Sequence, residues 1–186
     1  MGNLAALDVW RASVSKHRVG YALLAAAVAT HIATVSGYWY KIIGIPVLGW
    51  PQFNGILLLG HTGSSTNGAQ QFWAGSIYHF LTGLCFGLIF VFLVHPLIPI
   101  RNTFFGNIAK ALIWGTILAT FSALLWVPRN FPEFHPGFFT NNLGWKTVIG
   151  IYIWHLVYGL HIGAFYNPLP EAADQPRAVA VPSASA

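Results

Sequence analysis

Apolar residues gather into four long runs along this chain, separated by shorter stretches that contain prolines, glycines and most of the charges. The runs cover residues 19–40, 72–94, 108–127 and 147–166. Each holds roughly 20 residues, which as an α-helix matches the thickness of the hydrocarbon core of a bilayer. The pattern predicts an all-α integral membrane protein, with residues 19–167 forming a four-helix transmembrane domain.

The two ends of the chain differ from this domain. Residues 1–18 predict a cytoplasmic or interfacial segment, with a short helix from Leu4 to about Val14 that places apolar and basic side chains as a helix in the membrane interface needs. Residues 168–186 are rich in Pro, Ala and Ser. Such a composition is typical of disorder, so we expect a tail without regular structure.

Two connecting segments carry unusual patterns. Residues 48–60, LGWPQFNGILLLG, are apolar but too short to span a bilayer. We expect an interfacial or re-entrant piece that leans on the helices to satisfy its backbone. Residues 128–146 are rich in phenylalanine, which predicts a cap on the membrane or a docking surface.

Charge agrees with a membrane protein and gives an orientation. Only 7% of the 186 residues are charged, against roughly 25% in soluble domains. Arg11, Lys16 and Arg18 precede the first run, and Arg101 and Lys110 lie around the connection between the second and third. Because basic residues favour the cytoplasmic side, we expect both termini in the cytoplasm. The net charge of +5 is too dispersed for a nucleic-acid surface.

Acidic residues are too few and too scattered for most catalytic sites. The chain has two aspartates and two glutamates, all of them outside the four runs. Paired carboxylates for hydrolysis or transfer are therefore missing, and a proton or cation pathway has little to use. A transporter or channel ranks third among the functions that we consider.

The second and fourth runs share a short repeat. Each carries histidine, glycine and glycine at positions i, i+4 and i+8, which place the three residues on one stripe of a helix. The repeated residues are His79, Gly83 and Gly87, and His155, Gly159 and Gly163. Glycines at this spacing let two helices approach closely in lipid. The simplest arrangement is two helical hairpins related by an approximate two-fold axis.

Depth along the helices places three histidines in one layer. Counting the helical rise from the predicted outer ends puts His79, His155 and His31 about 10, 12 and 13 Å into the membrane. Thr120 is the polar residue at that depth in the third run.

Several interpretations of this histidine layer stay open. His79 and His155 are candidate axial ligands of a b-type haem, with Gly83 and Gly159 making room for the macrocycle. With His31 added, the three imidazoles could instead bind copper or zinc. A single histidine could ligate the magnesium of a chlorophyll-type pigment. Alternatively, the neutral imidazoles hydrogen-bond across helices and bind no cofactor.

Three motifs resemble a known family. The loop GWPQFNGILLLG and the helices with YHFLTG and WHLVYGLHIG are similar to the YagU-like group of bacterial four-helix inner-membrane proteins, over roughly residues 44–166. Members often carry an acidic residue in the loop, where this chain has Gln52, Phe53 and Asn54. The resemblance implies a four-helix fold and an inner-membrane location, and it implies no activity.

These observations favour a non-catalytic subunit that packs against other membrane subunits of a larger energy-transducing complex. The aromatic outer segment and the lack of a catalytic constellation are its main support. The alternative is a small membrane electron carrier that binds haem through His79 and His155.

Overall fold

Four helices of the protein are long and apolar enough to cross a membrane. The computed structural model describes residues 2–60 and 67–170, so of the predicted tail 168–186 only the first three residues are within the described part. The helices that could span are Arg18–Ile43, Gly68–Leu97, Phe104–Asn130 and Trp145–Phe165. The described residues form helices and connecting turns without a strand. The predicted all-α membrane class is therefore confirmed.

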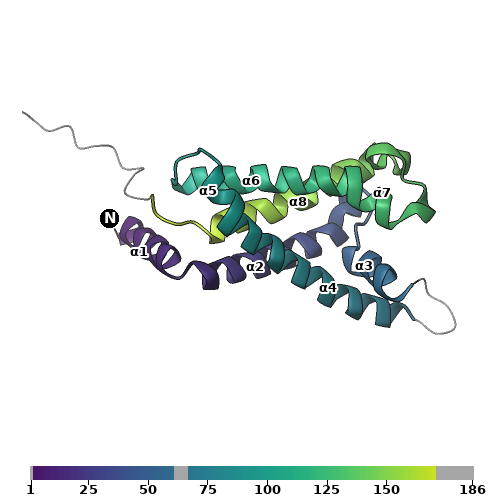
Figure 1. Cartoon of the computed structure of the whole chain (residues 1–186), viewed down its shortest axis with the longest axis horizontal. Coiled ribbons are helices and arrows are strands. Elements are labelled where there is room, and N and C mark those ends of the chain that lie inside the picture. Colours follow the sequence, from purple (N-terminus) through teal and green to yellow (C-terminus); the bar gives the residue numbers. More distant parts are fainter. Residues whose placement is uncertain (1, 61–66, 171–186) are drawn as a thin grey trace, which may run out of the picture.

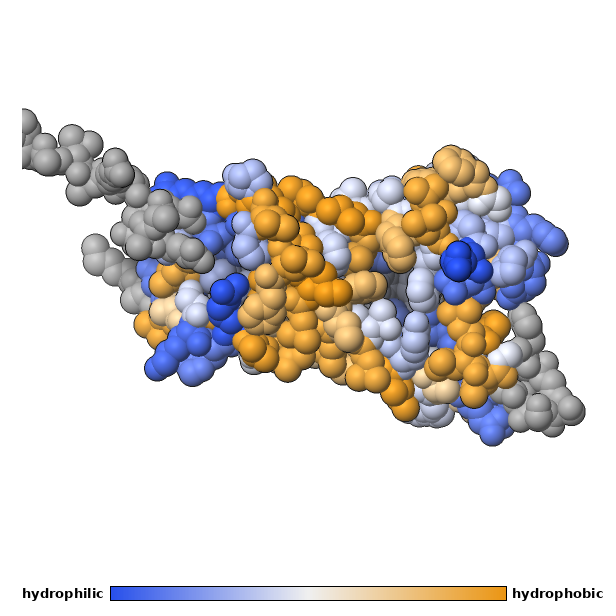
Figure 2. Space-filling view, in the orientation of Figure 1, coloured by the Kyte–Doolittle hydropathy of each residue, from blue (hydrophilic) through white to orange (hydrophobic). Residues whose placement is uncertain are grey.

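The described residues combine these long helices with shorter ones (Figure 1). The elements are α1 (Gly2–Lys16), α2 (Arg18–Trp39), α3 (Trp50–Leu59), α4 (Gly68–Ile89), α5 (His95–Leu97), α6 (Phe104–Phe121), α7 (Val127–Asn130) and α8 (Trp145–Phe165). Hydrophobic side chains cover the middle of the molecule and hydrophilic ones gather at both ends (Figure 2). This banding is what a bilayer requires.

The spans begin a few residues before the predicted positions, because polar caps extend two of them. Asn67 caps α4 by accepting a hydrogen bond from the backbone N–H of Gln70, whose side chain bonds back to the Asn67 backbone. Thr103 caps α6 through the backbone N–H of Gly106. Such caps satisfy backbone donors at a helix start, so polar residues outside the apolar runs join the helices.

Helix α2 packs against α4 and α8, and α8 packs also against α6. The buried face of α2 is a stripe of small residues at helical spacing: Ala22, Ala25, Ala26, Ala29 and Ala33. Small side chains let helix backbones approach closely in lipid, where the hydrophobic effect does not draw helices together. Helices α2 and α8 therefore each pack against two other spans, with α4 and α6 on either side of this pair.

Both glycine stripes of the repeat lie at helix contacts. A Cβ added at Gly83 would lie 2.1 Å from Oγ1 of Thr30 on α2, and one added at Gly159 would lie 2.5 Å from the carbonyl oxygen of Ala111 on α6. Each stripe thus packs against the preceding membrane-spanning helix. The glycines serve close helix packing and cannot be exchanged for larger residues without separating the helices.

The apolar segment 48–60 forms α3, which folds back against the first half of α4. Pro51 stands in its first turn, and Gly60, at a φ of 75°, ends it. A Cβ added at Gly75 of α4 would lie 1.8 Å from the carbonyl oxygen of Pro51, and one added at Gly55 would lie 2.0 Å from that of Gln71. Two facing glycines therefore let α3 lie directly on the backbone of α4.

Helices α4 and α6 share a local break. In each, a π-helical segment precedes a proline by two residues: Phe90–Val94 before Pro96, and Ser122–Trp126 before Pro128. Proline has no N–H, so in this i to i+5 register the carbonyls of Val91 and Ala123 lose their backbone donor.

Side chains supply the missing donors. Arg18 Nη2 donates to the Val91 carbonyl over 3.4 Å, and Thr140 Oγ1 donates to the Ala123 carbonyl over 2.6 Å. Among the described residues, α4 and α6 make no extensive contact with each other. They diverge toward the end of the bundle that carries α3 and α7 (Figure 1).

Candidate functional site

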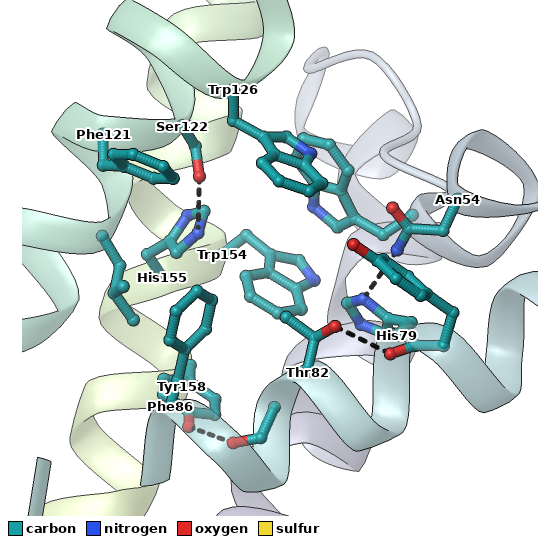
Figure 3. A pocket seen from close by; sticks show the side chains of 14 residues that line it. Asn54, His79, Thr82, Phe86, Phe121, Ser122, Trp126, Trp154, His155 and Tyr158 are labelled. Carbon is teal, nitrogen blue, oxygen red and sulfur yellow. Dashed lines mark hydrogen bonds between the residues drawn. The ribbon is translucent and has the colours of Figure 1, made fainter. Parts of the chain in front are cut away.

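A cleft lies where α4 and α6 diverge, with α8 as its floor and α3 at one end. Its volume is about 70 Å³. Aromatic rings and two imidazoles dominate the lining (Figure 3). The lining residues with side chains discussed below are Asn54 from α3; His79, Thr82 and Phe86 from α4; Phe121, Ser122 and Trp126 from α6 and the following π segment; and Trp154, His155 and Tyr158 from α8.

His79 joins three helices through both of its ring nitrogens. Its Nδ1 lies 3.2 Å from Nδ2 of Asn54 on α3, and its Nε2 lies 2.9 Å from Oγ1 of Thr34 on α2. Thr34 in turn donates to the carbonyl of Thr30. These contacts fix one tautomer, in which Nδ1 accepts from the Asn54 amide and Nε2–H donates to Thr34.

His155 is bonded just as fully. Its Nδ1 lies 2.8 Å from the carbonyl oxygen of Ile151, one turn earlier in α8, so Nδ1 carries the proton. Its Nε2 lies 3.1 Å from Oγ of Ser122, at the start of the π segment that follows α6, and accepts from this hydroxyl. His155 therefore ties α8 to the second wall of the cleft.

The indole of Trp154 lies between the two imidazoles (Figure 3). Its ring centroid is 5.3 Å from that of His79 and 4.9 Å from that of His155. The ring of Tyr158 stacks on it, with centroids 6.2 Å apart, and the Tyr158 hydroxyl donates to the carbonyl of Gly83. The two imidazoles and the Tyr158 hydroxyl thus have protein partners, whereas the buried indole N–H groups of Trp50 and Trp154, which also line the cleft, have no hydrogen-bond acceptor among the described residues. The cleft therefore offers flat aromatic surface to an occupant, with two indole N–H donors.

Of the predicted histidine layer, His79 and His155 line the same cleft, whereas His31 does not. His31 is exposed and lies on the face of α2 opposite the buried alanine stripe. Within the described part of the chain, no group of three or more His, Cys, Asp or Glu side chains could hold a metal ion. The three-histidine copper or zinc site thus lacks its third ligand in this arrangement.

A haem does not fit between His79 and His155 as the structure describes them. The cleft has roughly half the volume of a cavity of about 150 Å³ that binds benzene. All four ring nitrogens have protein partners, and Trp154 occupies the space between the rings. Gly83 and Gly159 face neighbouring helices and leave no room for a macrocycle. Ligation would need both imidazoles to release a partner and the indole to move away.

Residues that the sequence analysis did not assign to a site complete it. Trp154 and Ser122 are the neighbours of His155, and Asn54 and Thr34 are the partners of His79. The sequence did contain a signal for Asn54, since a polar amide within the apolar segment 48–60 needs a buried partner. Thr120, the expected polar residue at this depth, instead bonds the Tyr152 hydroxyl over 2.8 Å.

Comparisons with known proteins give no relative: no family model, no curated protein and no solved structure matches this chain.

Proposed function

We propose that this chain is a non-catalytic subunit of a larger energy-transducing membrane complex, with both termini on the cytoplasmic side. The observation that carries the proposal is the cleft between α4 and α6. Its histidines are fully bonded inside the protein, as structural imidazoles are, and its rim is apolar. A volume of about 70 Å³ suits one apolar side chain from a neighbouring transmembrane helix.

The position of the cleft favours a protein occupant within the bilayer. Phe121 at the rim is 41% exposed, and Phe86 and Trp126 are half-buried. Large aromatic rings around a recess at a subunit contact are typical of binding hot spots.

A cleft-filling variant tests the proposal in native membranes. Thr82 lines the cleft and bonds only its own helix, through the carbonyl of Tyr78. In Thr82→Leu, the added side chain takes the occupant's place, so a partner that co-purifies in stoichiometric amount should be lost. Thr116→Leu is the matched control, because Thr116 makes the same bond to Leu112 on α6 but lies outside the cleft.

Cross-linking gives a second measurement. A photoreactive residue at Phe121 should form one defined adduct with the co-purifying subunit. Ile113, also on α6 and also 41% exposed, lies outside the cleft and should form none with it. A stable monomer that purifies with nothing bound, or lipid adducts alone at both positions, would refute the proposal.

The second candidate is a small electron carrier, and one observation favours it: His79 and His155 reach the same cleft. An absorption spectrum of the purified chain, oxidised and then reduced with dithionite, separates the two functions. A Soret band that His155→Ala abolishes would support the carrier. A colourless protein would leave the subunit role.

A further inference from the structure

A second recess, here called the basic groove, lies at the end of the bundle that carries α1 and the described end of the chain. It has a volume of about 940 Å³, within the range of roughly 300–1,000 Å³ for ligand sites. Arg18, His95, Arg101 and Lys110 line it, together with the segment 168–170. The groove is separate from the cleft between α4 and α6 and shares no residue with it.

The floor of the basic groove is held rigidly. Lys110 is 4% exposed, and its Nζ donates to Oδ1 of Asn102 over 2.7 Å and to the carbonyl of His95 over 3.2 Å. The ring of His95 bonds Asn107, whose amide bonds Asn167 and the carbonyl of Pro168. These bonds connect the starts and ends of three membrane helices, so the groove is a built feature of the fold.

Helix α1 is hydrogen-bonded to this network. The buried guanidinium of Arg11 donates to the carbonyls of Asn102 and Pro168, and the hydroxyl of Ser15 accepts from the backbone N–H of Leu169. Burial lowers the pKa of Arg11 from its ordinary value, and the Asp8 carboxylate opposes this effect. A guanidinium stays protonated throughout, so Arg11 adds a positive charge behind Asn102 and Pro168, two residues of the groove's lining.

Two further cations stand at the open side. Arg101 is exposed and makes no side-chain hydrogen bond or ion pair with the described residues. Arg18 donates to the Tyr166 hydroxyl and the Val91 carbonyl, and its guanidinium lies 5.3 Å from the centre of the Phe92 ring. Neither arginine has a carboxylate partner in the described part of the chain.

The level of the groove in the membrane indicates the ligand. Arg18 begins the first span, and the second and fourth spans end at Leu97 and Phe165, next to the groove. Positive charge at this level meets lipid head groups, and basic pockets between membrane helices bind anionic ones. A guanidinium also matches a phosphate with two parallel hydrogen bonds.

We propose that the basic groove binds the phosphate of an anionic phospholipid, with Arg18 and Arg101 as the cations that contact it. The lipid's acyl chains then lie along the apolar surface beside Phe92, which is 46% exposed. This site would anchor α1 and the ends of the spans to one leaflet, whatever partner the cleft binds.

Native mass spectrometry of the full chain in detergent tests the proposal. With phosphatidylglycerol and phosphatidylcholine of the same acyl chains, the protein should retain phosphatidylglycerol preferentially. Arg101→Gln should weaken its binding about tenfold, as expected for one lost charge-assisted contact. Arg18→Gln/Arg101→Gln should abolish the preference. Arg129→Gln is the matched control, because Arg129 is an exposed arginine on α7, at the opposite end.

Four outcomes would overturn the proposal. Equal retention of both lipids would show that charge is not recognised. An equal loss in Arg129→Gln would show that the effect is general surface charge. Displacement of the lipid by millimolar inorganic phosphate would assign the groove to a soluble anion. Lipid binding that appears only in the double variant Glu171→Gln/Asp174→Asn would assign the groove to the chain's own carboxylates, which follow Pro170 in the sequence.

Discussion

The two helices that border the cleft, α4 and α6, solve the same backbone problem in different ways. Both place a π segment before a proline, and both leave one carbonyl without its backbone donor. In α4 a half-buried arginine at the membrane edge bonds that carbonyl. In α6 the fully buried Thr140, from the 3-10 helix Phe138–Leu143, bonds the corresponding carbonyl.

This difference reflects how enclosed the two donors are, since Val91 and Ala123 are both fully buried and lie at similar distances from the ends of their spans. The contact of the Arg18 guanidinium is only partly buried, so water can replace it and the contact can be loose. Deep inside the fold no water is available, and an unsatisfied carbonyl is destabilising. The short bond from Thr140 is maintained although Thr140 adopts a φ of 59°, which β-branched residues rarely do.

The largest expected effect concerns how the α4 wall is held by α3. In Gly75→Ala the new Cβ would meet the carbonyl oxygen of Pro51, so α3 must move away from α4. We expect the free energy of unfolding to fall by at least about 2 kcal/mol. Reversible unfolding in mixed micelles measures it. The control is Gly68→Ala in the same helix, where a Cβ meets nothing within 4 Å. Equal losses in both variants would show that α3 is not a support of this wall.

The second effect concerns the α6 wall. Thr140→Val keeps the shape and the β-branch of the side chain but removes the donor to Ala123, so the buried carbonyl loses its partner. We expect a loss of about 1–3 kcal/mol of unfolding free energy, measured in the same micelles.

A double-mutant cycle shows whether Thr140 acts through this carbonyl. Pro128→Ala restores a backbone N–H five residues after Ala123, in the register of the π segment. In that background, Thr140→Val should lower the unfolding free energy by less than about 1 kcal/mol. If the full effect of Thr140→Val persists, the threonine stabilises the loop in some other way.

The sequence predicts the elements of this fold better than their orientation. Apolar runs locate all four spans, and the short apolar segment 48–60 is correctly expected to lean on the helices, as α3 does on α4. Helical rise also predicts a similar depth for His79 and His155, and the two residues line the same cleft. It gives no direction around the helix axis, so His31 was placed in the same layer although it points away from the bundle.

Features that depend on contacts between distant helices could not be predicted from the sequence. The position of Trp154 between the two imidazoles depends on how α8 lies relative to α4, which no local sequence pattern encodes. The sequence does contain a signal for the direction of His31, since the alanine stripe marks the buried face of α2. Pro96 and Pro128 do not by themselves predict the π segments, because the side chain that supplies the lost hydrogen bond comes from a distant part of the sequence.

The smallest effect concerns the arginine of the α4 wall. Arg18→Met keeps the apolar stem beside Phe92 and removes the donors to Val91 and Tyr166. Because the contact to Val91 is 3.4 Å long and half-buried, water can replace the guanidinium, and we expect a loss below about 1 kcal/mol. Unfolding in lipid-free micelles measures this contact without any contribution from a bound phospholipid, and Arg129→Met serves as the exposed control. A loss as large as that of Thr140→Val would mean that burial of the donor does not distinguish the two walls, and that both carbonyls depend equally on their side-chain donors.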